Sequence, residues 1–154
     1  PRRMDPTRTT TATSTLAVAN VFLVVDDHEK ALAFYRDVLG FTVVSDHAQG
    51  EFRWLHLTPP AQPDLTMTIQ SAVGGMHTSE EDRSAIDTLL AEGLLTPVVL
   101  RCAGVVAVFE HVRASGAEVL QEPMDQFYGV RDCAFRDPAG NMLRFKTALP
   151  DQAG

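Results

Sequence analysis

The clearest hydrophobic pattern lies near the start of the chain, where a short apolar run gives way to apolar positions at helical spacing. Residues 20–25 read Asn-Val-Phe-Leu-Val-Val, which is typical of a strand. Asp26 and Asp27 suit the N-cap of a helix, and apolar residues then recur every three or four positions over 31–39. Gly40 ends this pattern, and another apolar run follows at once. The pattern predicts a strand, a helix and a second strand in succession.

The same order of elements continues through the first half of the chain and repeats in the second. The first half adds apolar runs at 52–57 and 65–69, with a turn-rich stretch between them. The second half predicts a strand, a helix and three further strands at 98–100, 105–114, 118–120, 127–135 and 142–145. Two βαβββ modules in tandem, an α+β fold, account for this repetition.

The connection between the modules is too long for a bare loop in a compact domain. Ser79 begins a capping-box sequence, and apolar residues at helical spacing predict an extra helix at about 80–91. We expect it to cover a sheet face or edge, with a pocket lid or a contact with a second subunit as the alternative. The domain plan is thus a disordered tail at 1–16, a first module at 17–72, a linker with a helix at 73–96, a second module at 97–148 and a tail at 149–154. The N-terminal tail has no apolar segment typical of a secretory signal.

Two motifs carry a resemblance to a known family. FYRDVLGF at 34–41 and FRDPAGN at 135–141, each within a βαβββ module, resemble the vicinal oxygen chelate superfamily of glyoxalases, bleomycin-resistance proteins and extradiol dioxygenases. The resemblance covers roughly residues 17–147. It implies a curved mixed sheet around a cavity, and commonly a homodimer in which modules pair within or between chains. It does not fix the activity, because one fold carries many chemistries.

Strand alternation predicts which side chains face that cavity, because successive residues of a strand point to opposite faces. In the first strand Val21, Leu23 and Val25 should face the helix, which leaves Asn20 and Phe22 on the opposite face. The same argument along the other strands gives the candidate ligand-binding residues: Asn20, Phe22, Trp54, His56, Thr68, Gln70, Arg101, Tyr128, Asp132 and Arg144.

The metal ligands of the superfamily are poorly matched in this chain. The resemblance implies a His or Gln at the start of each module's first strand and a Glu near the end of its last strand. These positions fall on four sites here: Asn20, Thr68 or Gln70, Pro97 and Arg144. Proline offers no ligand, arginine is a permanent cation, and neutral Asn, Thr or Gln bind first-row metals weakly. We therefore expect no metal and no other cofactor, with a divalent metal as the alternative.

The polar candidates leave alternatives open. For His56 we favour a hydrogen-bonded pocket residue over a direct ligand contact. A role as general base is the least favoured of the three, and His56 is the only candidate catalytic residue. Arg101 and Arg144 need a counter-charge if buried, either an internal carboxylate such as Asp132 or Glu122, or an anionic ligand group. Among the aromatic residues expected on the cavity face, Trp54 and Tyr128 are the predicted ligand contacts.

Composition narrows the range of partners. The net charge of −7 argues against nucleic acid, and no stretch reaches the roughly 18 apolar residues of a membrane span. Cys102 and Cys133 show no CxxC spacing and fall in predicted strands, which favours buried thiols in the reducing cytoplasm.

These observations favour a metal-free protein that sequesters a small aromatic or natural-product-like molecule, in the manner of the bleomycin-resistance proteins, and we do not expect an enzyme. One alternative is a metal-dependent lyase, isomerase or dioxygenase whose atypical site combines His56 with carboxylates such as Asp132, Glu122 or Glu51. Another is a structural or regulatory domain whose pocket is filled by its own side chains.

Overall fold

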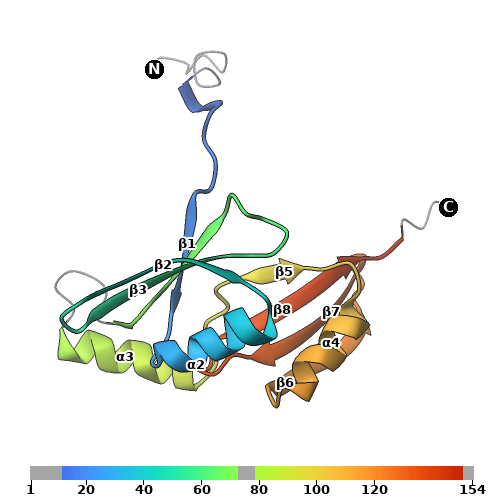
Figure 1. The fold of residues 1–154 in the computed structure, drawn as a ribbon. Helices are drawn as coiled ribbons and strands as arrows, with labels where there is room; N and C mark the ends of the chain where they lie inside the picture. The colour runs from blue at the N-terminus through green and yellow to red at the C-terminus, as the bar shows by residue number, and fades with distance from the viewer. Residues whose placement is uncertain (1–11, 73–78, 151–154) are drawn as a thin grey trace, which may run out of the picture.

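Two four-stranded mixed sheets form the framework of the molecule (Figure 1). The computed structural model describes residues 12–72 and 79–150. The first sheet has the order β1-β4-β3-β2, with strands β1 (Asn20–Val24), β2 (Thr42–Gln49), β3 (Phe52–Thr58) and β4 (Thr66–Gln70). The second has the order β5-β8-β7-β6, with strands β5 (Val99–Arg101), β6 (Glu118–Asp125), β7 (Val130–Arg136) and β8 (Met142–Ala148). In each sheet the first strand pairs in parallel with the last, and the remaining pairs are antiparallel.

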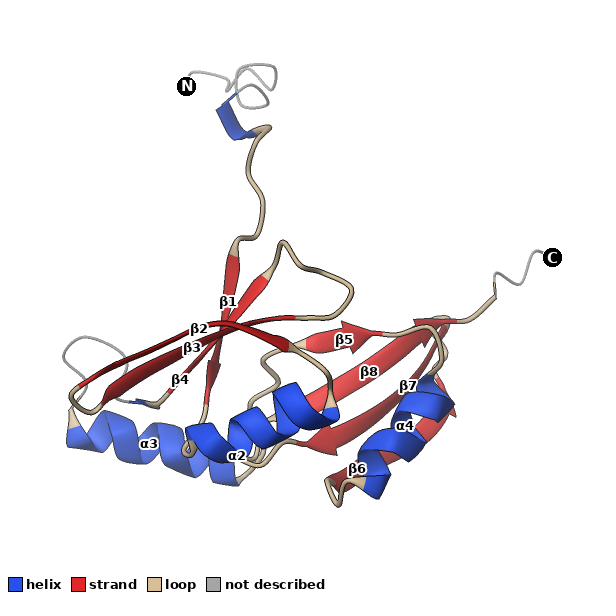
Figure 2. Cartoon of the chain, viewed as in Figure 1, coloured by secondary structure: helices blue, strands red, loops and turns tan. Residues whose placement is uncertain are grey.

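Each sheet carries its helix on one face, so the tandem βαβββ plan is confirmed (Figure 2). The first module contains α2 (His28–Leu32), which continues directly into a π-helix, η1 (Ala33–Val38). The second contains α4 (Val105–Ala114), and the connection between the modules contains α3 (Glu80–Ala91). In the described part of the chain no helix is long and apolar enough to cross a bilayer.

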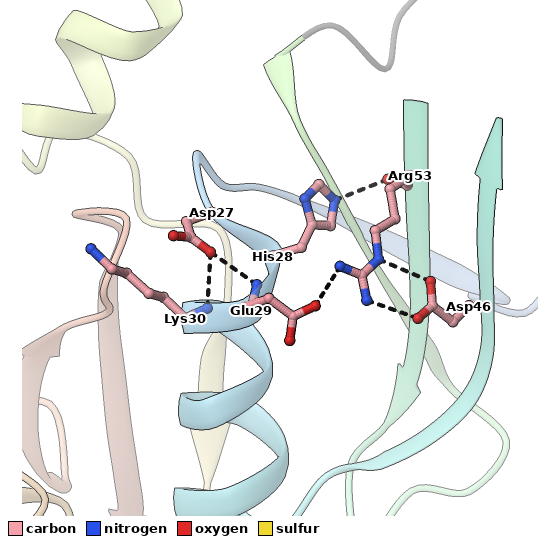
Figure 3. Close-up of polar contacts among 6 residues, drawn as sticks. All are labelled: Asp27, His28, Glu29, Lys30, Asp46 and Arg53. Atoms are coloured by element: carbon pink, nitrogen blue, oxygen red, sulfur yellow. Dashed lines mark hydrogen bonds and ion pairs between the residues drawn. The ribbon is translucent and has the colours of Figure 1, made fainter. Parts of the chain in front are cut away.

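The start of α2 is held by its cap and by a charged cluster beside it (Figure 3). The Asp27 carboxylate accepts hydrogen bonds from the backbone N–H groups of residues 29 and 30, at 3.0 and 3.1 Å, so the predicted cap is confirmed. Arg53 on β3 donates to Glu29 at 2.7 Å and to both carboxylate oxygens of Asp46 on β2. The His28 ring lies 2.9 Å from the Arg53 carbonyl oxygen. These contacts join the helix to the β2–β3 pair, away from the predicted cavity face.

The π-helix was not predicted, because the apolar spacing of residues 31–39 fits an ordinary helix. The widened turn is seen in the hydrogen bond from the Leu39 N–H to the Phe34 carbonyl, five residues back, at 2.9 Å. Tyr35 is completely buried next to Phe34 and Phe41. Its hydroxyl donates to the Asp137 carboxylate at 2.8 Å. The two sequence motifs of the superfamily are therefore in direct contact.

The helix-side faces of both sheets share one hydrophobic core. As alternation predicted, Leu23 and Val25 are almost fully buried, while Phe22, directly before Leu23, is 59% exposed. Two further hydrogen bonds join the modules: Asn141 donates to the Val24 carbonyl at 2.9 Å, and the His111 ring lies 2.7 Å from the Val38 carbonyl. The modules of one chain thus pack through their helices, which leaves the opposite sheet faces on the outside.

The predicted linker helix is present with its expected bounds. Ser79 caps it by accepting a hydrogen bond from the Asp82 N–H at 3.1 Å, and Leu90 near its end is buried. Gly140, in the turn before β8, lies directly against the backbone of Leu90. Residues 1–11, 73–78 and 151–154 lie outside the described part of the chain, so most of the predicted N-terminal tail and part of the linker are not covered.

The strand β6 differs from its prediction. A strand was expected only at 118–120, but it continues to Asp125 with irregular register against β7. The turn follows at residues 126–129, where the Gln126 N–H donates to the Val130 carbonyl at 2.7 Å. Irregular pairing accommodates Pro123 within the strand and hides the alternation on which a sequence prediction relies.

Candidate ligand-binding site

The outer face of the first sheet brings together most of the predicted site residues. A row of side chains crosses the sheet through directly paired residues: Phe22 on β1, Thr68 on β4, His56 on β3 and Ser45 on β2. Asn20 and Gln70 lie on the same face, on β1 and β4. Phe22 is exposed, His56 is half-buried, and Thr68 is only 1% exposed.

Three polar residues on this face form a hydrogen-bonded chain. The Thr68 hydroxyl donates to the side-chain oxygen of Asn20 at 2.8 Å. His56 Nδ1 lies 2.9 Å from the same hydroxyl oxygen. His56 therefore has its hydrogen-bond partner in its own module rather than in the second module.

Aromatic rings continue this face along β3. The rings of Phe52 and Trp54 are stacked, with centroids 5.8 Å apart and planes 13° from parallel. His47 on β2 is paired with Trp54, and its ring centroid lies 6.3 Å from that of His56. A half-buried stacked pair beside imidazole groups is a surface suited to flat, partly polar molecules.

His47 was missed by the sequence analysis and is not among the residues predicted to face the cavity. A β-bulge between Val43 and Ser45 shifts the alternation of β2 by one residue. This shift turns His47 to the same face as Trp54 and sends Asp46 to the helix side, where it meets Arg53. No sequence signal marked the bulge, and simple alternation fails beyond it.

The second sheet carries a different polar group, centred on the buried carboxylate of Asp132. Gln121 and Gln126 donate to Oδ1 at 2.7 and 2.9 Å. Arg144 donates to Oδ2 at 3.2 Å, and the Tyr128 hydroxyl lies 3.5 Å from it. Burial pushes the pKa of Asp132 upward, but the hydrogen bonds from Gln126 and Gln121 and the charge of Arg144 outweigh it and lower the pKa below its usual value.

This network gives one of the two arginines an internal counter-charge. Arg144 pairs with Asp132 rather than with Glu122, and it also donates to the Gln121 side-chain oxygen at 2.8 Å. Arg101 is exposed on β5, next to Lys146 on β8, and no ion pair between described residues occupies it. Sequence analysis missed Gln121 and Gln126, since both lie beyond the strand predicted at 118–120, whereas β6 continues to Asp125.

The predicted residues therefore form two groups, one on each sheet. The first comprises Asn20, Phe22, Trp54, His56, Thr68 and Gln70, and the second Arg101, Tyr128, Asp132 and Arg144. Within the described part of one chain no hydrogen bond joins the groups, and the sheets do not close into one around a common cavity. A cavity of about 660 Å³ lies between β1 and β5; it is lined mainly by core-side residues such as Val21, Met67 and Val112, and Arg101 is the only predicted site residue in its lining. The stacked rings and the polar chain lie on the sheet face, so we place the candidate site there.

The positions that hold metal in the superfamily do not suit a metal here. Asn20 is bound to Thr68, and Arg144 brings a cation paired with Asp132. Among the residues that the structure describes, no three His, Cys, Asp or Glu side chains are grouped to hold an ion. Cys133 is buried in the core, where burial raises the pKa of its thiol to about 11, and Cys102 is also a free thiol. The chemistry that this arrangement offers is stacking and hydrogen bonding.

Comparison with known proteins agrees with this architecture. The structure of UcmS2 matches with a TM-score of 0.76 and 30% sequence identity, covering 85% of this chain and 97% of that chain. TnmS3, an antibiotic binding protein from Streptomyces sp. CB03234, matches with a TM-score of 0.67 and 24% identity over 88% of this chain and 98% of its own. The uncharacterised protein YetH of Bacillus subtilis (strain 168) is 26% identical over 130 residues, 84% of this chain and 96% of YetH.

The family model gives the same result from sequence. It matches residues 17–145, which include both modules, the linker helix and both motifs that meet at Tyr35 and Asp137. The chain therefore belongs to the Glyoxalase/Bleomycin resistance protein/Dioxygenase superfamily.

Proposed function

We propose that the protein binds and sequesters a small, planar, partly polar aromatic molecule, without a metal and without chemical change to the ligand. The observation that carries this proposal is the stacked pair of Phe52 and Trp54 on an open sheet face, next to the hydrogen-bonded His56. Flat rings gain affinity by stacking and apolar burial, and a few polar groups beside them fix orientation.

The second sheet supports the same proposal. Arg144 is held in place by Asp132 and Gln121, so its remaining guanidinium N–H groups are preoriented donors for a ligand oxygen. Arg101 and Lys146 add positive charge to this face of an otherwise acidic protein. TnmS3, which shares the fold, is an antibiotic binding protein, and this is consistent with a natural-product ligand here.

We further propose that the working form is a homodimer in the reducing cytoplasm. The outward edges of β1 and β5 have no strand partner among the described residues, and such edges invite pairing with another chain. Phe22 on β1, Val99 on β5 and Tyr128 in the turn before β7 are large apolar or aromatic side chains that are exposed. A second copy would cover them and bring a first-sheet face opposite a second-sheet face, which completes one enclosed site from two chains. The two free cysteines are consistent with a reducing compartment.

Trp54 allows a direct test, because it is the only tryptophan of the chain and its fluorescence reports on the site alone. Titration of the wild-type protein with a panel of planar aromatic natural products should quench or shift this fluorescence for at least one compound, at one equivalent per chain. Calorimetry should then show that Trp54→Ala weakens binding of that compound about tenfold, which corresponds to the loss of one stacking contact of about 1.4 kcal/mol.

The matched control is Leu94→Ala, which truncates an exposed apolar side chain outside both groups and should leave affinity unchanged. Binding should persist in EDTA, and mass spectrometry should recover the ligand unchanged. A ligand converted to product, or affinity and melting temperature that both collapse in EDTA, would instead support the metal-dependent lyase, isomerase or dioxygenase.

A further inference from the structure

The hydrogen-bonded chain of Asn20, Thr68 and His56 has a direction, and this direction restricts what the site can bind. We infer that Asn20 and Thr68 hold His56 as the Nδ1–H tautomer, so that Nε2 is an acceptor and the site selects aromatic ligands carrying a hydroxyl or another hydrogen-bond donor. The inference deepens the proposed function and rests on it for the identity of the ligand class. Asn20 and Thr68 act here as positioning residues.

The argument starts from the single proton of the Thr68 hydroxyl. This hydroxyl is buried, so protein groups rather than bulk water must satisfy it. It has two neighbours, the Asn20 side-chain oxygen at 2.8 Å and His56 Nδ1 at 2.9 Å. One proton can be donated to only one of them, and the other neighbour must donate to the hydroxyl oxygen.

An amide oxygen cannot donate, so the assignment follows. The hydroxyl gives its proton to Asn20 and accepts a proton from His56 Nδ1. This orientation leaves the Asn20 amide N–H groups on its exposed side, where water can satisfy them.

The consequence concerns the other ring nitrogen. A neutral imidazole with its proton on Nδ1 has a lone pair on Nε2, and no hydrogen bond to a described residue occupies this atom. A ligand hydroxyl facing Nε2 gains a hydrogen bond, whereas a carbonyl or ether oxygen in the same place meets the lone pair. One neutral hydrogen bond in a half-buried site corresponds to about a five- to tenfold difference in affinity.

The first test needs no ligand. Nitrogen-15 NMR of the neutral His56 ring should place the proton on Nδ1 in the wild-type protein. Asn20→Asp, whose carboxylate can only accept, and Thr68→Ser, which keeps the hydroxyl, should preserve this tautomer. In Asn20→Leu the Thr68 hydroxyl loses its acceptor and can donate to Nδ1, and in Thr68→Val the hydroxyl is absent. Neither variant should therefore keep the proton on Nδ1. A wild-type ring protonated on Nε2 would overturn the inference even if aromatic ligands bind.

The second test uses 1-naphthol and its methyl ether 1-methoxynaphthalene, in which a methyl group replaces the hydrogen-bond donor. The wild-type protein should bind 1-naphthol about five- to tenfold more tightly than the ether, and Thr68→Val should abolish this difference. Equal affinities for the wild-type protein would overturn the selection of donors. If neither compound nor any other planar aromatic binds while NMR finds the Nδ1–H form, the proposed function fails and the tautomer assignment stands.

Discussion

The buried carboxylate of Asp132 shows how single residues shape the second sheet. Its two oxygens are shared among Gln121, Gln126, Arg144 and Tyr128. The direction of the shift in the pKa of Asp132 decides how the carboxylate affects stability at each pH. Because the pKa of Asp132 is lowered in the folded protein, the ionised carboxylate stabilises the fold above the unfolded-state pKa, and this contribution is lost as pH falls through the folded-state pKa.

Asp132→Asn should therefore destabilise the protein in a pH-dependent way. Near pH 7 we expect a loss of about 1 to 3 kcal/mol in the free energy of unfolding, the usual range for a charge-assisted hydrogen-bond network. The difference between wild type and variant should shrink between about pH 5 and pH 2, as the wild-type carboxylate becomes protonated. Urea unfolding followed by Trp54 fluorescence measures both values. A difference that stays constant down to pH 2 would contradict the ionised network.

Residue faces could be predicted wherever the strands are regular. Alternation correctly sent Leu23 to the core and left Phe22 outside, and it placed Thr68 beside His56. It gave no face for His47 and Gln121, and simple alternation would misplace them because each follows an irregularity in strand pairing. A bulge changes the register through backbone geometry, and the residues near Val44 carry no Gly or Pro signal that reveals it.

At the scale of elements, caps and glycines were the reliable signals. Asp27 and Ser79 cap their helices as predicted, since their side-chain oxygens satisfy N–H groups that the helix itself leaves open. The π-helix at 33–38 could not be foreseen, because its apolar positions also fit ordinary helical spacing. The widened turn occurs where Tyr35 is drawn into the core to reach Asp137.

The end of α3 against the turn before β8 gives a prediction at this scale. Gly140 has φ 110°, and a Cβ added there would lie 2.1 Å from the backbone oxygen of Leu90. Gly140→Ala should therefore lower the free energy of unfolding by about 2 to 4 kcal/mol, measured by urea unfolding.

Gly50→Ala is the matched control. Gly50 also has a positive φ, 62°, but open space surrounds the added Cβ, so only the backbone cost of about 1 to 2 kcal/mol remains. Equal losses in the two variants would contradict a tight contact between α3 and this turn.

For the whole molecule, the two modules of one chain are joined through their helix sides and open on their outer sides. Tyr35 and Asp137 form a buried link between the modules, and burial raises the pKa of both groups, which keeps the Tyr35 hydroxyl protonated as a donor. The same packing leaves the outer faces and the edges of β1 and β5 without a partner among the described residues. The proposed dimer follows from this arrangement.

Two variants with the same change in side chain test the dimer. Val99 on β5 and Val106 on α4 are 45% and 51% exposed. Val99→Asp should place a charge in the proposed interface and shift the protein to a monomer, while Val106→Asp should remain dimeric. Sedimentation equilibrium measures the masses. A monomeric wild-type protein, or dissociation caused by Val106→Asp alone, would contradict the proposed interface.

The sequence by itself determined the two modules, the linker helix, the superfamily and the core side of each regular strand, because periodicity, caps and turns are local properties of the chain. Only the tertiary structure decided that Tyr35 meets Asp137, that His47 joins Trp54, and that Asp132 is surrounded by Gln121, Gln126 and Arg144. It also decided that the modules pack through their helices, leaving two open faces. These outcomes depend on strand register and on contacts between distant segments, and a buried polar group finds its partner only when the chain is folded.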